Sequence, residues 1–157
     1  MLKEGLIKEL KMSRKCILNT TECIRDADGS YAPKEGMLTL TQQVSHVAHT
    51  IHWFLDGAFS GKGFDLDFES SWGEVNKVGS LSEAFEVLDK AYANAEEVIS
   101  SKSEMELMAP LPEGPIMGGA PTFAIVHGIS EHTAHHRGSL AVYARLLGKE
   151  PKMPYAD

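Results

Sequence analysis

Apolar residues at helical spacing are the feature that most constrains the fold of this chain. The clearest run covers residues 80–99, where apolar side chains recur every three or four positions, as on one face of a helix. The stripe consists of Leu81, Ala84, Phe85, Leu88, Ala91, Tyr92, Ala95 and Ile99. Ser80 and Glu83 form an S-x-x-E capping box, in which each side chain satisfies a free backbone N–H. The pattern predicts a long amphipathic helix that begins at Ser80.

Two earlier helices are predicted in the same way. The first covers Leu2 to about Arg25 and is broken by the glycine, proline and aspartate of DADGSYAPKEG, residues 26–36. The second opens at Thr39, which forms a T-x-x-Q capping box with Gln42, and stops before the glycines of residues 61–63.

A fourth helix is predicted from about Pro121, because proline is favoured in a first turn. It ends where Gly148 provides a C-terminal cap and Pro151 prevents continuation. Residues 61–79 have no sustained period and predict a long connection, either a crossover between parallel helices or a lid. Residues 108–121 form a second loop, rich in proline and glycine.

No stretch alternates as a strand would, and no internal repeat is present. The 157 residues suit one hydrophobic core. We therefore predict an all-α fold, a four-helix bundle that forms a single domain over residues 1–157.

Charge and composition exclude several classes of partner. A net charge of −7 disfavours nucleic acid and anionic membranes, and no apolar stretch approaches the roughly 20 residues of a membrane span. The start MLKEGLIKELK lacks the apolar block of a secretory signal. Cys16 and Cys23 lie seven residues apart in a predicted helix, about 10 Å and too far for a disulfide. Free thiols predict a cytoplasmic protein, and neither cysteine has a motif typical of a nucleophile.

Three histidines in EHTAHHRG, residues 131–138, raise the question of metal binding. Each helical residue advances about 100°, so the apolar residues of the fourth helix define its buried face. His136 lies about 20° from that face, His132 about 60° and His135 about 120°. We expect His132 and His136 to point inward, where the i, i+4 spacing lets two imidazoles share one ion, and His135 to point outward.

The second helix supplies candidates for a third ligand. His46 lies closest to the apolar face of that helix, roughly 80 to 90° from its centre, whereas His49 and His52 lie about 140° away. Trp53 falls on the same side as His46 and is expected to wall a cleft there. The alternative is that these imidazoles are hydrogen-bonded structural groups. His49, His52, His127 and His135 are expected to be surface or packing residues.

The flanking residues limit the chemistry. Thr133 stands where the H-E-x-x-H metalloproteases carry their glutamate base, so proteolysis is a poor interpretation. No phosphate-binding glycine loop and no G-x-S-x-G elbow occurs. Arg137 is expected to hold a carboxylate or a loop carbonyl. Gly138, which costs a helix about 1 kcal/mol relative to alanine, is expected to mark the close approach of a neighbouring helix.

The two histidine segments, QVSHVAHTIHWF and EHTAHHRGSLAVYARLLGK, resemble the DinB-like superfamily, and the similarity covers essentially the whole chain. The resemblance implies an up-down-down-up four-helix bundle with a long crossover between the second and third helices. It also implies a divalent metal ion held by His46, His132 and His136, and a homodimer. Ser139 departs from the family, in which many members have glutamine after R-G.

The same resemblance implies an activity. Some relatives use a low-molecular-weight thiol as co-substrate, in S-transfer or in isomerisation of maleylpyruvate-type compounds. We therefore expect a zinc, nickel or iron enzyme that acts on a small molecule by thiol transfer or hydrolysis, with the crossover and the PIMGGAP loop, residues 115–121, at the mouth of the pocket. A non-enzymatic metal-binding or stress-response protein, and a purely structural or dimerising bundle, remain the alternatives.

Overall fold

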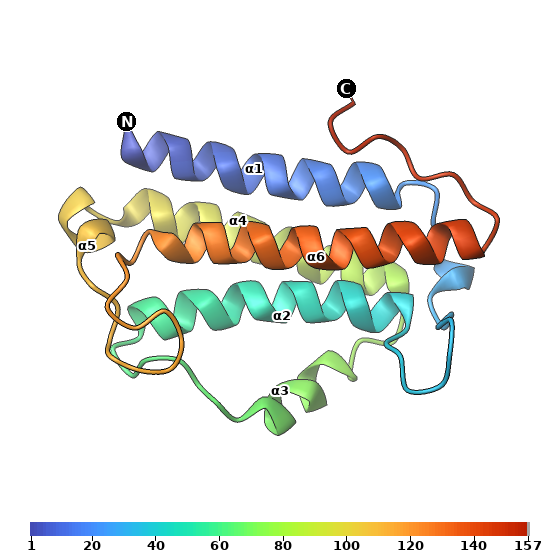
Figure 1. The fold of residues 1–157 in the computed structure, drawn as a ribbon, viewed down its shortest axis with the longest axis horizontal. Helices are drawn as coiled ribbons and strands as arrows, with labels where there is room; N and C mark the ends of the chain where they lie inside the picture. Colours follow the sequence, from blue (N-terminus) through green and yellow to red (C-terminus); the bar gives the residue numbers. More distant parts are fainter. Residues whose placement is uncertain (157) are drawn as a thin grey trace.

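Four long helices lie side by side in the computed structural model, which describes residues 1–156 (Figure 1). They are α1 (Leu2–Thr21), α2 (Leu40–Phe59), α4 (Leu81–Ser101) and α6 (Ala124–Leu146). α2 packs against α4 and α6, and α1 packs against α6 and α4, so the four helices form a closed ring of neighbours. α1 and α6 run in one direction and α2 and α4 in the other (Figure 1). The predicted up-down-down-up bundle is confirmed.

The crossover between α2 and α4 contains a helix that the sequence did not predict. Because α2 and α4 are parallel, the chain must return along the bundle between them, as the lower part of Figure 1 shows. Within this segment Phe68–Val75 forms the short helix α3, which packs against α2. The Asp67 side chain accepts a hydrogen bond from the Ser70 backbone N–H and so caps α3. Only Val75 of α3 is buried, which explains why no apolar period revealed it.

α1 ends at Thr21, earlier than the predicted limit near Arg25. The hydroxyls of Thr20 and Thr21 donate to backbone carbonyls one turn earlier, those of Cys16 and Ile17. The 3-10 turn η1 (Asp26–Asp28) follows and leads the chain toward α2.

α6 begins at Ala124, three residues after the predicted Pro121. The residues before it are held by the segment after the small helix α5 (Glu104–Met108): the Thr122 N–H donates to the Ala109 carbonyl, and Pro110 and Pro121 form an isolated bridge. No strand occurs within residues 1–156. At the other end of α6, Gly148 has a φ of +73°, which confirms the predicted glycine cap.

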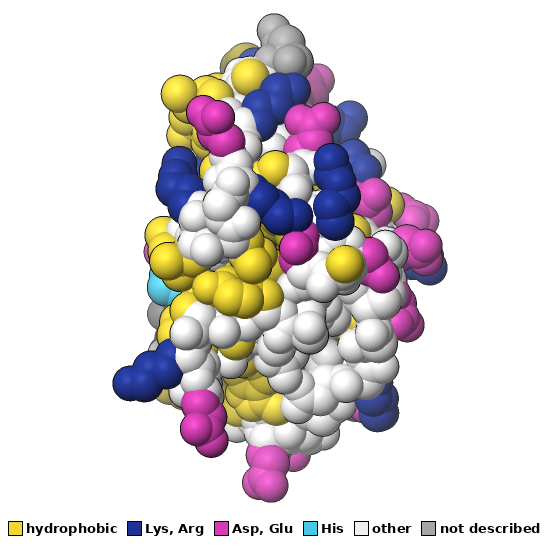
Figure 2. Space-filling model, turned by 90° about the vertical axis from the view of Figure 1, so that its right-hand side faces the viewer, with side chains coloured by type: hydrophobic (Ala, Val, Ile, Leu, Met, Phe, Trp, Pro, Cys, Tyr) yellow, Lys and Arg dark blue, Asp and Glu magenta, His cyan; other side chains and the backbone are white. Residues whose placement is uncertain are grey.

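The apolar stripes of all four helices meet in one buried cluster. Its largest fully buried side chains include Leu10, Ile17, Leu40, Ile51, Leu88, Tyr92, Ile99, Ile125, Ile129 and Leu140. Charged side chains of both signs lie interspersed on the end of the bundle that Figure 2 shows, beside a hydrophobic patch. Within residues 1–156 no helix combines the length and the apolar character needed to cross a membrane.

The close helix contact expected at Gly138 lies instead at Gly128. A Cβ built on Gly138 meets nothing within 4 Å, so that expectation is wrong. A Cβ on Gly128 falls 2.8 Å from the ring of Phe54, because the Phe54 ring of α2 packs directly against α6 there. A glycine inside a helix lowers the stability of that helix. At Gly128 the close packing of Phe54 compensates for this loss, whereas at Gly138 no close contact does so.

The two glycines make a matched pair of stability predictions. Gly138→Ala should raise the free energy of unfolding by about 0.5–1 kcal/mol, because alanine favours the helix and its methyl group meets open space. Gly128→Ala should lower it by about 1–3 kcal/mol, because the Phe54 ring must move. Urea unfolding of both variants measures the difference, and equal effects at the two sites would contradict the packing described.

Candidate metal centre

Three histidines from two helices meet at the interface between α2 and α6. One ring nitrogen from each of His46, His132 and His136 can be chosen so that all three lie within 4.8 Å of one another. The Nε2 atoms of His46 and His132 are 3.2 Å apart. The ring centroid of His136 lies 4.9 Å from the ring centroid of His46 and 4.6 Å from that of His132. This group could hold a metal ion.

Helix geometry explains why these three imidazoles converge. His132 and His136 are one turn apart on α6, on the side that faces α2, whose His46 projects from the opposite wall. His136 is buried, at 8% exposed, and His132 is half-buried, whereas His135 is exposed. The division of the EHTAHHRG histidines into an inward pair and an outward one is therefore confirmed.

A buried glutamine fixes one of the rings. The Gln43 side chain is 3% exposed, and its Oε1 lies 3.0 Å from His136 Nδ1. An amide oxygen only accepts, so His136 Nδ1 carries the proton and Nε2 keeps its lone pair for a metal. Sequence reasoning missed Gln43. The signal was present, because Gln43 lies one turn before His46 and is a polar residue on the apolar face of α2.

Burial keeps these imidazoles neutral. The pKa of His136 is lowered from its ordinary value of 6.5 to about 3, mainly by desolvation and in smaller measure by the neighbouring His132 and His46. Desolvation likewise lowers the pKa of His132 to about 4, with His46 as the second cause. The pKa of His46 is also lowered, mainly by burial. Neutral imidazole is the form that binds a metal ion, so protons compete weakly for this group.

The donor set fits a zinc-like ion. Zinc–nitrogen bonds of 2.0–2.1 Å in a tetrahedron place neighbouring nitrogens about 3.3 Å apart. The 3.2 Å between His46 Nε2 and His132 Nε2 is close to that edge, and a ring nitrogen of His136 lies within 4.8 Å of the other two ligand nitrogens. Three imidazoles would leave one position of a tetrahedral ion for water or substrate.

A tryptophan from the crossover covers His46. The ring of Trp72, in α3, stacks on the His46 ring with centroids 4.8 Å apart and an angle of 15° between the planes. The stack packs one face of the imidazole and shields it from water on that side. Sequence analysis placed SWGEVNK in a connection and gave no role to Trp72, because the contact depends on how the crossover folds back on α2.

A small cavity of about 200 Å³ opens beside the histidines. Its lining consists of His46, Thr50, Trp53, Phe54, Phe68, Ser71 and His132. Trp53 therefore walls the cleft as predicted, and its Nε1–H holds the crossover by donating to the Asp65 carbonyl at 2.7 Å. The crossover contributes Phe68 and Ser71. The expectation that residues 115–121 also form the mouth is wrong, because none of them lines this cavity.

The remaining histidines have other surroundings. His49 and His52 are half-buried and line a wider hollow of about 700 Å³ on the other side of Trp53 and Phe68. His49 Nδ1 lies 2.8 Å from the Ser45 carbonyl, which fixes that ring against its own helix. His127 is exposed and lies 3.0 Å from Glu9 of α1. Within residues 1–156 none of these three joins the cluster.

Other residues near the cluster play no part in it. Arg137 was expected to hold a carboxylate or a carbonyl, but its guanidinium lies over the ring of Tyr155, 6.0 Å from the centroid. Ser139 donates weakly back to the His135 carbonyl at 3.4 Å and lies outside the cluster.

The lowered pKa values predict how the metal-free protein responds to acid. Because the folded pKa of His132 and His136 lies below the ordinary 6.5, the unfolded chain binds more protons in the window from about pH 6.5 down to 4. The free energy of unfolding should therefore fall as the pH falls through this window. Urea unfolding in chelator between pH 7 and 5 measures the slope.

His132→Gln should flatten this slope, because one of the responsible groups no longer titrates. A stability that is flat across this window in the native sequence would contradict the prediction.

Comparison with known proteins gives a family match over the whole chain. The model of the DinB family matches residues 1–157. A search of curated proteins found no match.

Two solved structures from Bacillus subtilis share the fold. YfiT, described as a probable metal-dependent hydrolase with an unusual four-helix bundle topology, has a TM-score of 0.71 at 16% identity, covering 94% of this chain and 89% of its own. YjoA, a DinB-like protein, has a TM-score of 0.65 at 17% identity, covering 94% of this chain and 95% of its own. At these identities the likeness establishes the fold.

Proposed function

The chain belongs to the DinB family, and from this premise we propose that it is a single-domain, metal-dependent hydrolase of small molecules, with His46, His132 and His136 as the metal ligands. The observation that carries the proposal is the convergence of three neutral imidazoles, two of which, those of His46 and His132, line a cavity. A structural metal site is closed by a fourth protein ligand, whereas a catalytic site keeps a position open. Within residues 1–156 no other histidine, cysteine or carboxylate joins the group.

The cavity indicates the kind of substrate. Trp53, Phe54 and Phe68 provide apolar, mostly aromatic walls, and Thr50 and Ser71 provide two hydroxyls. A volume of about 200 Å³ admits a small molecule or one end of a larger one. We expect a substrate with a flat or apolar group next to the bond that is cleaved.

The residues that line the cavity indicate which roles fall to the metal ion and which to the protein. No carboxylate is among the seven lining residues, so the chain supplies no carboxylate base at the cavity. A divalent ion, when bound, supplies Lewis acidity and an acidic water or thiol ligand near neutral pH. The protein's own residues hold the ion, exclude water through Trp53 and Trp72, and orient the substrate against the aromatic walls. The description of YfiT as a probable metal-dependent hydrolase supports the same reaction class.

Turnover after metal reconstitution tests the proposal. The protein is purified without a histidine tag, stripped with chelator and reloaded separately with zinc, nickel, cobalt or iron. A panel of small aryl and alkyl esters and amides is then assayed with and without low-molecular-weight thiols. We expect metal-dependent hydrolysis of aryl substrates. His136→Ala should abolish this activity, and the His135→Ala variant should retain it.

Two outcomes would favour a different function over hydrolysis. Turnover that requires a thiol and transfers its sulfur to the substrate would indicate thiol transfer. A fully metal-loaded protein that turns over no member of the panel would favour the non-enzymatic metal-binding alternative.

A further inference from the structure

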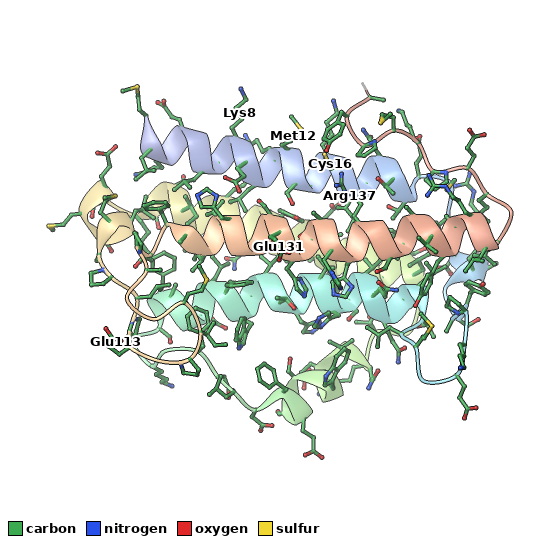
Figure 3. All side chains as sticks on the ribbon, in the orientation of Figure 1. Lys8, Met12, Cys16, Glu113, Glu131 and Arg137 are labelled. Atoms are coloured by element: carbon green, nitrogen blue, oxygen red, sulfur yellow. The ribbon has the colours of Figure 1, made fainter. Side chains whose placement is uncertain are left out.

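A groove on the far side of α6 from the histidine cluster has no role in the proposed reaction. It lies where α1 and α6 run side by side, and its volume is about 420 Å³. Figure 3 shows Met12 and Cys16 of α1 and Arg137 of α6 gathered along this contact. The volume falls within the range of small-molecule sites.

The floor and walls of the groove are mainly apolar. Its apolar lining residues include Met12, which is 45% exposed, the buried Cys16 and the exposed Ala134. The polar groups beneath them are satisfied: Tyr92 Oη lies 2.8 Å from Ser13 Oγ and 2.9 Å from Thr133 Oγ1. A ligand in the groove would therefore meet a largely apolar surface.

The hydroxyl of Ser130 is the exception. Its Oγ is buried in the groove lining and has no hydrogen-bond partner among the described residues, the one such side-chain atom found there. Buried polar atoms are nearly always paired, so this hydroxyl is available to a partner from outside the chain, either a water molecule or a ligand group.

Charge divides the two ends of the groove. Glu9 lies at the end nearer the start of α6, where His127 is its neighbour at 3.0 Å. Arg137 lies at the other end, and no carboxylate or carbonyl among residues 1–156 pairs with its guanidinium, which rests on the Tyr155 ring. Lys8 also lines the groove, but it neighbours Glu9 in the chain, so the two ends differ in that the Arg137 end has a cation without a lining carboxylate beside it. An anionic group is thus favoured at the Arg137 end.

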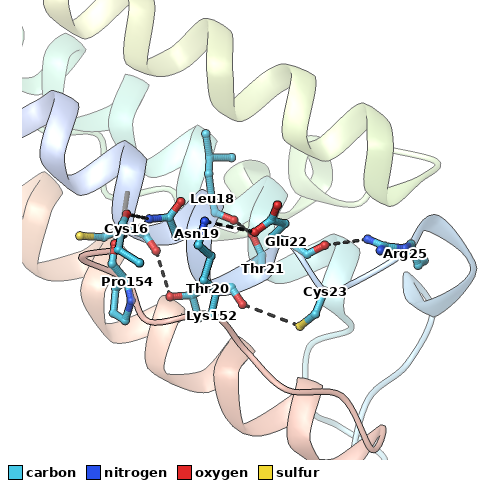
Figure 4. A network of polar contacts seen from close by, with 11 residues as sticks. Cys16, Leu18, Asn19, Thr20, Thr21, Glu22, Cys23, Arg25, Lys152 and Pro154 are labelled. Atoms are coloured by element: carbon cyan, nitrogen blue, oxygen red, sulfur yellow. Dashed lines mark hydrogen bonds and ion pairs between the residues drawn. The ribbon is translucent and has the colours of Figure 1, made fainter.

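The C-terminal segment closes that end. Asn19 of α1 donates hydrogen bonds to the carbonyls of Pro154 and Ala156, at 2.9 and 2.8 Å, as the close view in Figure 4 shows for Pro154. These bonds hold the intervening Tyr155 beside Arg137, so the cation and the aromatic ring form an end wall.

We propose that this groove is a second binding site, for a small amphipathic carboxylate. The carboxylate pairs with Arg137, and the apolar chain lies over Met12 and Ala134 toward Ser130. Ser130 and Arg137 are seven residues apart on α6, about 10 Å along the axis, which sets the length of the ligand. Ser130 Oγ exposes almost no surface as placed, so rotation of the Ser130 side chain toward the groove would let it bond a hydroxyl at the far end of the ligand, and a long-chain ω-hydroxy acid fits that arrangement.

Calorimetric titration of the full-length protein tests this site with four probes: decanoate, ω-hydroxydecanoate, decanol and decyltrimethylammonium. We expect the two carboxylates to bind most tightly and ω-hydroxydecanoate to bind more tightly than decanoate. Arg137→Gln should weaken decanoate binding about tenfold or more and leave decanol unchanged, because only the charge-assisted contact is lost. Ser130→Ala should remove the preference for the ω-hydroxyl group.

Two further variants control for folding and for occupancy of the groove. Ala134→Leu fills the groove with a good helix former and should abolish binding of all probes. Arg145→Gln, at an exposed arginine of the same helix that bonds to its own backbone, should change nothing. Circular dichroism and unchanged metal content confirm that each variant is folded and that the histidine cluster is intact.

The proposal fails if no probe binds saturably, or if Arg137→Gln and Ala134→Leu leave binding unchanged. It fails equally if sedimentation reveals a dimer that Ala134→Leu dissociates, because the groove would then be an interface between two copies of the chain.

Discussion

Replacing His46, His132 or His136 with alanine should reduce bound metal to near zero, whereas His135→Ala should retain it. Each of the first three substitutions removes one of the three imidazoles in the group, so the remaining two would hold an ion weakly. Removing the hydrogen-bond partner of a metal ligand lowers metal affinity roughly 10–100-fold. Removing the ligand itself should lower the affinity by more than this. Metal content of untagged protein, measured by mass spectrometry, gives the result directly.

His135 is a demanding control because it is the sequence neighbour of His136, and the two rings lie 5.0 Å apart. It differs in direction: His135 faces solvent and His136 faces α2. Circular dichroism should show that all four variants remain helical. If His135→Ala loses as much metal as His136→Ala, or if none of the variants loses metal, the assignment of the ligands is wrong.

Gln43→Leu should weaken metal binding by about 10–100-fold without removing any ligand. The substitution leaves His136 Nδ1–H without its acceptor inside the bundle, so the ring loses both its fixed orientation and its fixed tautomer. Competition against a chromophoric chelator measures the change in affinity. Gln43→Glu should restore most of it, because a carboxylate oxygen accepts the same proton.

The neighbouring glutamine provides the matched control. Gln42 closes the capping box of α2, its Oε1 accepting from the Thr39 N–H at 2.9 Å. Gln42→Leu should therefore lower stability by about 1 kcal/mol and leave metal affinity unchanged. Equal losses of affinity in the two variants would mean that Gln43 acts through the stability of α2 and not through His136.

The sequence predicted the parts of this molecule that repeat with a period. Apolar residues mark every long helix, and the same angular argument separated His132 and His136 from His135, because a helix fixes the direction of each side chain relative to its neighbours. His46 could be ranked above His49 and His52 for the same reason. The capping boxes placed the starts of α2 and α4 at Thr39 and Ser80, where the structure has them.

The parts that escaped prediction depend on contacts between distant segments. Trp72 covers His46 only because the crossover folds back along α2, and the eight residues of α3 bury one side chain, too few for a pattern. Gln43 is a polar residue on an apolar face, whose purpose is visible only when His136 is placed beside it. Gly138 and Gly128 both lie inside α6, and the position of Phe54 on the neighbouring helix decides which of them marks a close contact.

The chain has two tryptophans, and both stand at the histidine cluster, Trp53 in the cavity wall and Trp72 against His46. All tryptophan emission therefore originates beside the candidate centre. A paramagnetic ion such as nickel or copper should quench this emission on binding, a diamagnetic ion such as zinc should not, and a ligand that enters the cavity should shift its wavelength. The protein thus carries a built-in optical reporter that can follow occupancy in real time and without a label.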